Sequence, residues 1–336
     1  MTHELKNIIR AFKVAKEKKQ KTVLATVVAL EGSSYRRPGV RMLIREDGKR
    51  TGAVSGGCVE KEIIRQAQSI FSDDMPKMMV YDGRYRLGCE GVLYILIEPF
   101  VPSPAFLDAF NDVLNNRAQF NIVSTFTKEE GNHSDLGSFF IFGEEKFAVR
   151  PGVVLDNKRT LFEQEMNPCF KLVIIGAEHD AVQLCSFASL AGWEVTIVAA
   201  AAEEKSINDF PGASLFLAEE PEMLSIKLID KQTAIVLMTH SYVRDLKYLL
   251  AIKKSRPIYL GLLGPTQRRE KLLNEFIEHY PEVSDTFLDI IHGPAGLDIG
   301  AETAQEIALA ILSEILSVTR NKEPIMLKNK QGRIHT

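Results

Sequence analysis

The stretch Lys171-Leu-Val-Ile-Ile-Gly-Ala-Glu-His-Asp-Ala181 decides the fold of the second half of this chain. It reads as a short apolar strand, a glycine turn and the start of a helix that runs to Leu190. Further apolar runs follow at 194–198, 234–238, 258–260 and 289–291, with helical stretches between them. Strands that alternate with helices indicate right-handed βαβ units, so the sequence predicts a doubly wound parallel sheet that ends with a helix over 301–318.

The first half of the chain has a different pattern. Apolar residues at helical spacing predict a helix over 5–17, and β-branched, apolar runs predict strands over 22–30 and 40–44. Strands are also expected over 92–97, 120–127 and 138–150, and helices after residue 58 and over 104–115. The periodicity weakens over 151–170. We therefore expect an α+β domain over 1–165 and the doubly wound domain over 166–336, in line with roughly 150 residues per domain.

The composition is that of an ordinary globular protein, with 336 residues, 45% hydrophobic and 25% charged. A net charge of -3 gives no reason to expect nucleic acid or an anionic membrane as partner. The basic run Lys16, Lys18, Lys19 and Lys21 is interpreted as a solvated helix end. The N-terminus lacks the layout of a signal peptide, and no apolar stretch is long enough to cross a bilayer, so we expect a cytoplasmic protein.

An arginine-containing loop joins the first two predicted strands. The loop Gly32-Ser-Ser-Tyr-Arg-Arg-Pro-Gly39 contains the guanidinium groups of Arg36 and Arg37 and the hydroxyl of Ser33, and Arg41 follows shortly after. The planar guanidinium group binds phosphate or carboxylate oxygens in a bidentate way, so this loop is a candidate anion site. A turn whose arginines face water is the alternative.

Two cysteines have glycine neighbours. Ser55-Gly56-Gly57-Cys58 runs directly into a predicted helix, whose N-terminus favours anions and lowers the pKa of a thiol. Cys58 is therefore a candidate thiolate, although a small buried cysteine in a turn fits the same pattern. Gly88-Cys89 also lies in a glycine-flanked loop, where a buried and inert thiol is the alternative. The four cysteines of the chain contain no CxxC pair, which argues against a structural zinc site.

These segments resemble a known family. Gly32-Ser-Ser-Tyr-Arg-Arg-Pro-Gly-Val-Arg-Met-Leu43 and Gly52-Ala-Val-Ser-Gly-Gly-Cys-Val-Glu60 are similar to the signature of XdhC/CoxI proteins, which are accessory factors of xanthine dehydrogenase and related molybdenum hydroxylases. Gly88-Cys-Glu-Gly91 resembles the family's Gly-Cys-Gly-Gly segment, with Glu90 in place of a glycine. The second domain resembles the Rossmann domain of the same family in the segments at 173–179, 238–245, 259–264 and 291–300.

The second domain departs from the dinucleotide-binding fingerprint. The second glycine of G-x-G-x-x-G is replaced by Glu178, and the strand ending at Val198 is followed by four alanines in place of an acidic residue. NAD(P) binding in the standard mode is therefore disfavoured. Polar residues and a glycine-rich helix approach still follow the predicted strands, where open α/β sheets bind ligands. These candidates are His240, Asp245, His292, Gly296 and Asp298.

The resemblance implies a chaperone that binds the molybdenum cofactor (molybdopterin) transiently and delivers it, sulfurated, to a xanthine dehydrogenase-type molybdenum hydroxylase. We expect a homodimer, with a cysteine desulfurase as a further candidate partner. Cys58 is the candidate catalytic residue and molybdenum ligand. The candidate cofactor-binding residues are Ser33, Arg36, Arg37, Arg41, Ser55, Gly56, Gly57, Cys58, Gly88, Cys89, His240, Asp245, His292, Gly296 and Asp298. The alternatives are an NAD(P)-dependent oxidoreductase and a sulfur carrier with a persulfide on Cys58.

Overall fold

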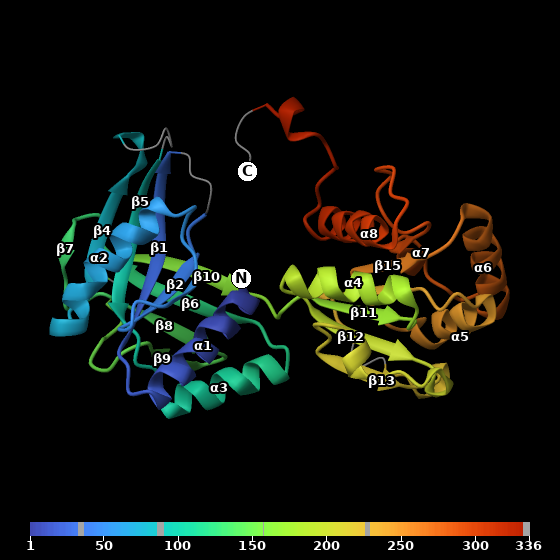
Figure 1. Ribbon diagram of the computed structural model, residues 1–336, viewed down its shortest axis with the longest axis horizontal. Helices are drawn as coiled ribbons and strands as arrows, with labels where there is room; N and C mark the ends of the chain where they lie inside the picture. The colour runs from blue at the N-terminus through green and yellow to red at the C-terminus, as the bar shows by residue number, and fades with distance from the viewer. Residues whose placement is uncertain (33–36, 86–90, 157, 226–228, 332–336) are drawn as a thin grey trace. The chain divides into compact units, whose positions relative to one another are not determined.

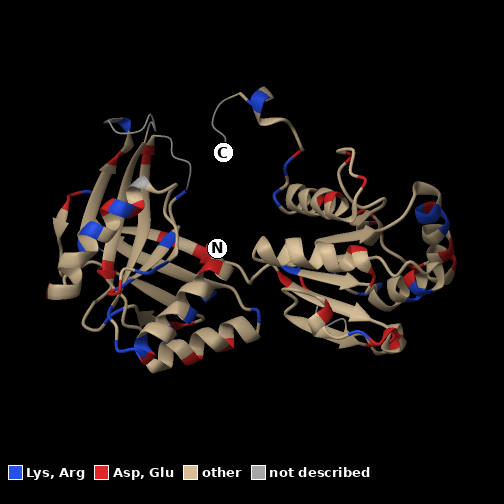
Figure 2. Cartoon of the chain, in the orientation of Figure 1, with Lys and Arg blue, Asp and Glu red and all other residues tan. Residues whose placement is uncertain are grey.

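The computed structural model describes residues 1–32, 37–85, 91–156, 158–225 and 229–331, with the backbone alone at Cys58 and Tyr85. The chain forms two compact units, Met1–Pro168 and Cys169–Thr336 (Figure 1). The predicted fold class is confirmed, since the first unit mixes helices with antiparallel sheets and the second is a parallel α/β unit. Acidic and basic residues are interspersed on both units (Figure 2). Within the described residues, no helix has the length and apolarity that a membrane span requires.

The first unit contains two antiparallel sheets. One has the strand order β3-β2-β1-β5-β4-β7 and the other β10-β6-β8-β9. The strands are β1 (Thr22–Gly32), β2 (Arg41–Arg45), β3 (Arg50–Gly52), β4 (Lys77–Asp82), β5 (Gly91–Pro99), β6 (Phe120–Phe126), β7 (Gly131–Asn132), β8 (Gly137–Phe142), β9 (Glu145–Ala148) and β10 (Thr160–Met166). The helices are α1 (Thr2–Glu17), α2 (Cys58–Asp73), α3 (Pro104–Asn115) and the short 3-10 turn η1 (Gly83–Tyr85).

Two apolar layers hold this unit together. Helix α2 buries Val59, Ile63 and Ala67 against one face of the first sheet, in contact with strand residues such as Ala25 and Ile95. Period-2 alternation along β1 places Leu24 on the opposite face of the same sheet. There α1, α3 and the second sheet share a phenylalanine-rich core, whose rings include Phe12, Phe100, Phe106, Phe110, Phe120, Phe140 and Phe142.

The second unit is a parallel sheet with the strand order β13-β12-β11-β14-β15-β16. Its strands are β11 (Lys171–Ile175), β12 (Glu194–Ala199), β13 (Leu215–Ala218), β14 (Thr233–Leu237), β15 (Tyr259–Leu262) and β16 (Ile291–His292). Its helices are α4 (His179–Leu190), α5 (Tyr242–Ile252), α6 (Thr266–His279), α7 (Asp285–Leu288) and α8 (Ala304–Thr319), with 3-10 turns η2 (Ala201–Glu203), η3 (Ile207–Asp209), η4 (Pro221–Met223) and η6 (Leu327–Asn329). Helices α4 and α8 cover one face of the sheet, and α5 and α6 cover the other (Figure 1).

This strand order fixes where a ligand would meet the second unit. The chain builds outward from β11 through β12 and β13, then returns to the other side of β11 with β14. In Rossmann-type sheets the crevice at this reversal, at the carboxyl ends of the strands, is the binding position. Here it lies between the segments that follow β11 and β14.

Two predicted elements differ from the structure for local reasons. The strand expected over 138–150 is a hairpin of β8 and β9, because Gly143 adopts φ 60° and turns the chain. The last helix begins at Ala304 rather than 301, since the Thr303 side chain accepts from the Glu306 N–H and Glu306 accepts from the Thr303 N–H. This reciprocal capping box sets the helix start.

Candidate functional site

The segment Val54–Gly57 that precedes α2 is organised by one buried carboxylate. The N–H groups of Val54 and Ser55 donate to Oε1 of Glu60, and the Ser55 hydroxyl and the Gly57 N–H donate to Oε2 at 2.8 Å each. Burial tends to raise the pKa of Glu60, but the hydrogen bonds from Ser55 and Gly57 outweigh it and hold the pKa below its usual value. Glu60 is therefore an ionised carboxylate that holds this loop in place through these hydrogen bonds.

The hydrogen bonds to Glu60 change which backbone groups of the loop are available to a ligand. Because the amides of Ser55 and Gly57 already donate to Glu60, they are not available to a phosphate as the helix-start argument expected. A Cβ built on Gly56 or Gly57 meets nothing within 4 Å, and Gly57 has φ 131°, a conformation that favours glycine. The backbone at these glycines is thus open to a closely approaching flat molecule.

Part of the predicted first-domain site lies outside the described residues. This is so for Ser33, Arg36, Gly88 and Cys89, and for the side chain of Cys58. The backbone of Cys58 is described and opens α2, directly after the N-cap residue Gly57.

The structure separates the two described arginines of the predicted anion site. Arg37 is exposed. Arg41, in β2, is only 6% exposed, and its Nη1 donates to the Gly39 carbonyl at 2.9 Å and to Oε1 of Gln164 at 2.6 Å. A surface ligand that contacts Arg37 therefore does not reach the Arg41 guanidinium in this conformation. Spacing of four residues suggested a shared site, but strand alternation and burial send Arg41 inward.

Arg41 belongs to a buried polar layer that the sequence did not reveal. Among the described residues its Nε and Nη2 have no hydrogen-bond partner, and burial lowers the pKa of Arg41 to about 10. Glu98, on β5, is fully buried and accepts from the N–H and hydroxyl of Ser138. Burial raises the pKa of Glu98 to about 7. The layer lies within the fold and is not open to a large ligand.

In the second unit, two predicted residues lie together at the sheet reversal. His240 has φ 55°, a strained conformation for a residue with a Cβ, and its Nε2 lies 3.5 Å from Oδ2 of Asp180. Asp245 is buried and accepts from the Thr239 hydroxyl at 2.6 Å and from Nη2 of Arg268 at 2.7 Å. This edge of the sheet therefore carries a cluster of polar side chains.

The other predicted residues of this unit lie near β16. Nδ1 of His292, the Tyr259 hydroxyl and the Gly296 N–H all bond the Glu314 carboxylate, at 3.1, 2.5 and 2.7 Å. The Tyr259 and His292 rings stack with centroids 4.5 Å apart. Burial, then the bond to Glu314, raises the pKa of Tyr259 far above its usual value. This set fastens the loop to α8, while Asp298 is exposed.

The five predicted residues thus fall into separate groups. Among the described residues no hydrogen bond joins the His240–Asp245 cluster to the His292–Gly296 cluster. In the residues that the structure describes, no group of three His, Cys, Asp or Glu side chains is placed to bind a metal ion.

Glu60, Asp180 and Glu314 are partners that sequence reasoning did not single out. Glu60 had a readable signal, because it stands at the capping-box position three residues after Gly57. Glu314 comes from the middle of α8 and meets His292 only through the tertiary fold. Nothing in local spacing connects the two.

Taken together, an antiparallel α+β unit with a glycine–cysteine helix start, joined to a Rossmann-type unit, defines a two-domain class of protein. Residues 15–82 match the XdhC and CoxI family, and residues 172–315 match the XdhC Rossmann domain. The chain belongs to the XdhC/CoxI family, which confirms the resemblance found in the sequence.

Relatives span nearly the whole chain. A probable xanthine dehydrogenase subunit of Bacillus subtilis (strain 168) is 27% identical over 329 residues, covering 90% of this chain and 95% of that protein. The "molybdenum cofactor insertion chaperone PaoD" of Escherichia coli (strain K12) is 26% identical over 328 residues, covering 96% and 91%. The crystal structure of a xanthine dehydrogenase from Bacillus halodurans superposes with a TM-score of 0.76 at 24% identity, covering 97% of this chain and 98% of that one, and shares the fold.

Proposed function

We propose that this protein is an accessory factor that binds the molybdenum cofactor as cargo and delivers it to a xanthine dehydrogenase-type molybdenum hydroxylase. The observation that carries the proposal is the similarity to a molybdenum cofactor insertion chaperone along 96% of the chain. On this proposal the protein handles a finished cofactor and is not a stand-alone enzyme. We place it in the cytoplasm, as a homodimer.

The first unit supplies a chemically suitable receptor for such cargo. The open backbone at Gly56 and Gly57 allows a flat pterin to approach closely, and the exposed guanidinium of Arg37 is suited to its phosphate. Cys58 begins α2, and a cysteine thiolate is a soft ligand suited to molybdenum. We assign Cys58 the role of a molybdenum ligand that protects the bound cofactor. A cysteine desulfurase supplies the sulfur for the sulfurated form.

The test is cofactor retention by the intact chain. The protein is purified from a molybdenum-replete host, and bound molybdenum is measured by mass spectrometry and pterin by fluorescence after oxidation. Cys58→Ser is expected to lower bound molybdenum at least about tenfold, because loss of a group that only orients a metal ligand already lowers metal affinity about 10- to 100-fold. Cys185→Ala, in the buried core of the second unit, serves as the matched control. Equal molybdenum in both variants would contradict the assignment of Cys58.

One observation keeps the oxidoreductase alternative in view, namely the Rossmann strand order. Against it, Glu178 is the N-cap residue of α4 and Asp180 lies in its first turn, where a pyrophosphate would need positive potential. A persulfide on Cys58 that acts without cofactor is the third function. Loss of sulfur transfer with intact cofactor retention in Cys58→Ser would favour it.

A further inference from the structure

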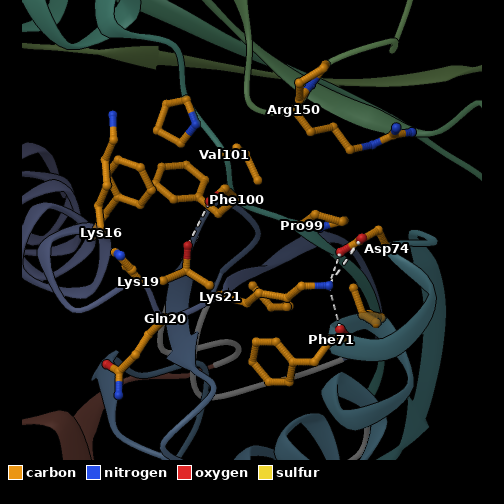
Figure 3. Close-up of a pocket in the computed structure, with 16 residues that line it drawn as sticks. Lys16, Lys19, Gln20, Lys21, Phe71, Asp74, Pro99, Phe100, Val101 and Arg150 are labelled. Atoms are coloured by element: carbon orange, nitrogen blue, oxygen red, sulfur yellow. Dashed lines mark hydrogen bonds and ion pairs between the residues drawn. The ribbon is translucent and has the colours of Figure 1, made fainter.

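A pocket in the first unit is lined by none of the residues that were assigned to the candidate functional site (Figure 3). It has a volume of about 510 Å³ and is formed where α1 and α2 end and β5 leaves its sheet. Its walls are apolar, with Phe12, Phe71, Pro99, Phe100 and Val101 among the lining residues. A volume of a few hundred Å³ with aromatic walls is typical of small-molecule sites.

The polar lining of this pocket is mostly cationic. Lys16, Lys19, Lys21 and Arg150 contribute, with Asp74 as the acidic lining residue. Nζ of Lys21 donates to the Phe71 carbonyl at 2.8 Å and forms an ion pair with Asp74 at 3.1 Å, so these two charges compensate each other.

Lys16 and Lys19 have no such compensation among the described residues, whereas Arg150 acts electrostatically on the buried carboxylate of Glu98. Among the described residues no carboxylate forms a salt bridge with Lys16, Lys19 or Arg150, and Arg150 instead donates to the carbonyls of Ser134 and Leu136. The basic run was interpreted from the sequence as a solvated helix end, but the fold places its lysines in different surroundings. Lys16, Lys19 and Lys21 line one cavity, whereas Lys18 does not.

The pocket is separate from the glycine–cysteine loop. Ile70, Phe71 and Asp74 line it at the end of α2, whereas Cys58 opens that helix. At 1.5 Å per residue, the backbone of Cys58 lies about 18 Å along α2 from Ile70, the first residue of this helix that lines the pocket. One small molecule does not span both.

We propose that this pocket binds a small aromatic anion, an aryl phosphate or aryl carboxylate, as a second ligand of the protein. The ring lies against the apolar wall of Phe71, Pro99 and Phe100, and the anionic group meets Lys16 and Lys19. Lys16 and Lys19 are exposed, so water and salt weaken their attraction for an anion, but their positive charge beside the pocket still favours an anionic group over a neutral one. The apolar wall adds the free energy of burying the ring.

The probe for this site is 8-anilinonaphthalene-1-sulfonate, whose fluorescence rises when its rings leave water. The uncharged analogue N-phenyl-1-naphthylamine has the same ring system without the sulfonate. The double variant K16E/K19E is compared with K13E/K18E, which makes the same charge change on the same helix end at positions that do not line the pocket. Thermal melting of each variant checks that the fold is intact.

The expected result is that K16E/K19E weakens binding of the sulfonate probe about tenfold, while K13E/K18E stays within about twofold of the parent protein. Phenyl phosphate and benzoate, as competitors of the probe, then tell phosphate from carboxylate preference. Equal binding of the probe by the two double variants would overturn the proposal. So would N-phenyl-1-naphthylamine binding as tightly as the sulfonate, because the site would then select rings without regard to charge.

Discussion

The starts of α2 and α4 show how two similar sequences build different local structures. A glycine shortly precedes each helix, and each helix start has a glutamate, which is the third residue of α2 (Glu60) and the N-cap residue of α4 (Glu178). At α2 the N3 residue Glu60 turns back and accepts from the loop that precedes the helix. At α4 the N-cap residue Glu178 is exposed and makes no side-chain cap hydrogen bond. A glycine-rich helix start is therefore not by itself an anion site, because the protein's own carboxylate can occupy the amides.

The glycines of these two segments also serve different purposes. A Cβ at Gly176 would lie 2.3 Å from the Met238 carbonyl oxygen, so this glycine allows the segments after β11 and β14 to pack together. A Cβ at Gly56 would meet open space. Gly176 thus belongs to the packing of the fold, whereas Gly56 leaves backbone accessible to a ligand.

The largest expected effect is on stability, and it distinguishes the two glycines. Gly176→Ala should destabilise the second unit by about 3 kcal/mol or more, because it combines a backbone clash with φ 139°. Gly56→Ala should change stability by less than about 0.5 kcal/mol. Urea unfolding followed by the fluorescence of Trp193, the single tryptophan and a residue of the second unit, measures the first effect. A wild-type midpoint for Gly176→Ala would show that the close approach relaxes without cost.

A smaller effect on stability is expected to distinguish the two glutamates. Glu60→Ala should lower the stability of the loop and α2 by about 2 kcal/mol, since it leaves buried donors unpaired. Glu178→Ala should cost less than about 0.5 kcal/mol, because its side chain caps nothing. Amide hydrogen exchange of peptides from 54–63 and from 176–186 reads the two sites separately.

The pH dependence of that effect has a definite sign. The pKa of folded Glu60 is lowered, so its stabilisation is present above the unfolded pKa and is lost as pH falls through the folded value. The penalty of Glu60→Ala should therefore be full near neutral pH and shrink in acid below about pH 4. A penalty that stays constant down to about pH 2 would mean that the charge of Glu60 is not what organises the loop.

The smallest effect concerns nucleotide binding at α4. Glu178→Gly restores the second glycine of the fingerprint, but Asp180 remains in the first helical turn and alanines still follow β12. We expect the variant to bind NADH less than about tenfold more tightly than the parent chain, with both in the millimolar range. Titration of NADH fluorescence measures this. Micromolar binding by the unaltered chain would instead support the oxidoreductase function.

The sequence predicted the second unit better than the first. Apolar runs such as 172–175 in β11 are buried on both faces of a parallel sheet, and strands buried in this way have continuous hydrophobic sequences. The sequence did not reveal β13, whose residues are half-exposed at the sheet edge. In the first unit, β4 and β10 were missed. The polar residues 163–165 interrupt the apolar pattern of β10, whereas β4 contains the short apolar run 78–81, a signal in the sequence that was not used.

By itself the sequence determined the alternation of strands and helices in the second unit, and the family, because these depend on local periodicity and short-range motifs. The tertiary structure decided which charges face inward and which residues meet. Arg41 and Arg37 are four residues apart yet differ in burial, and Lys16 and Arg150 are far apart in the chain yet line one pocket. Such outcomes depend on which strand faces are covered and on contacts between distant segments, and local spacing carries no record of either.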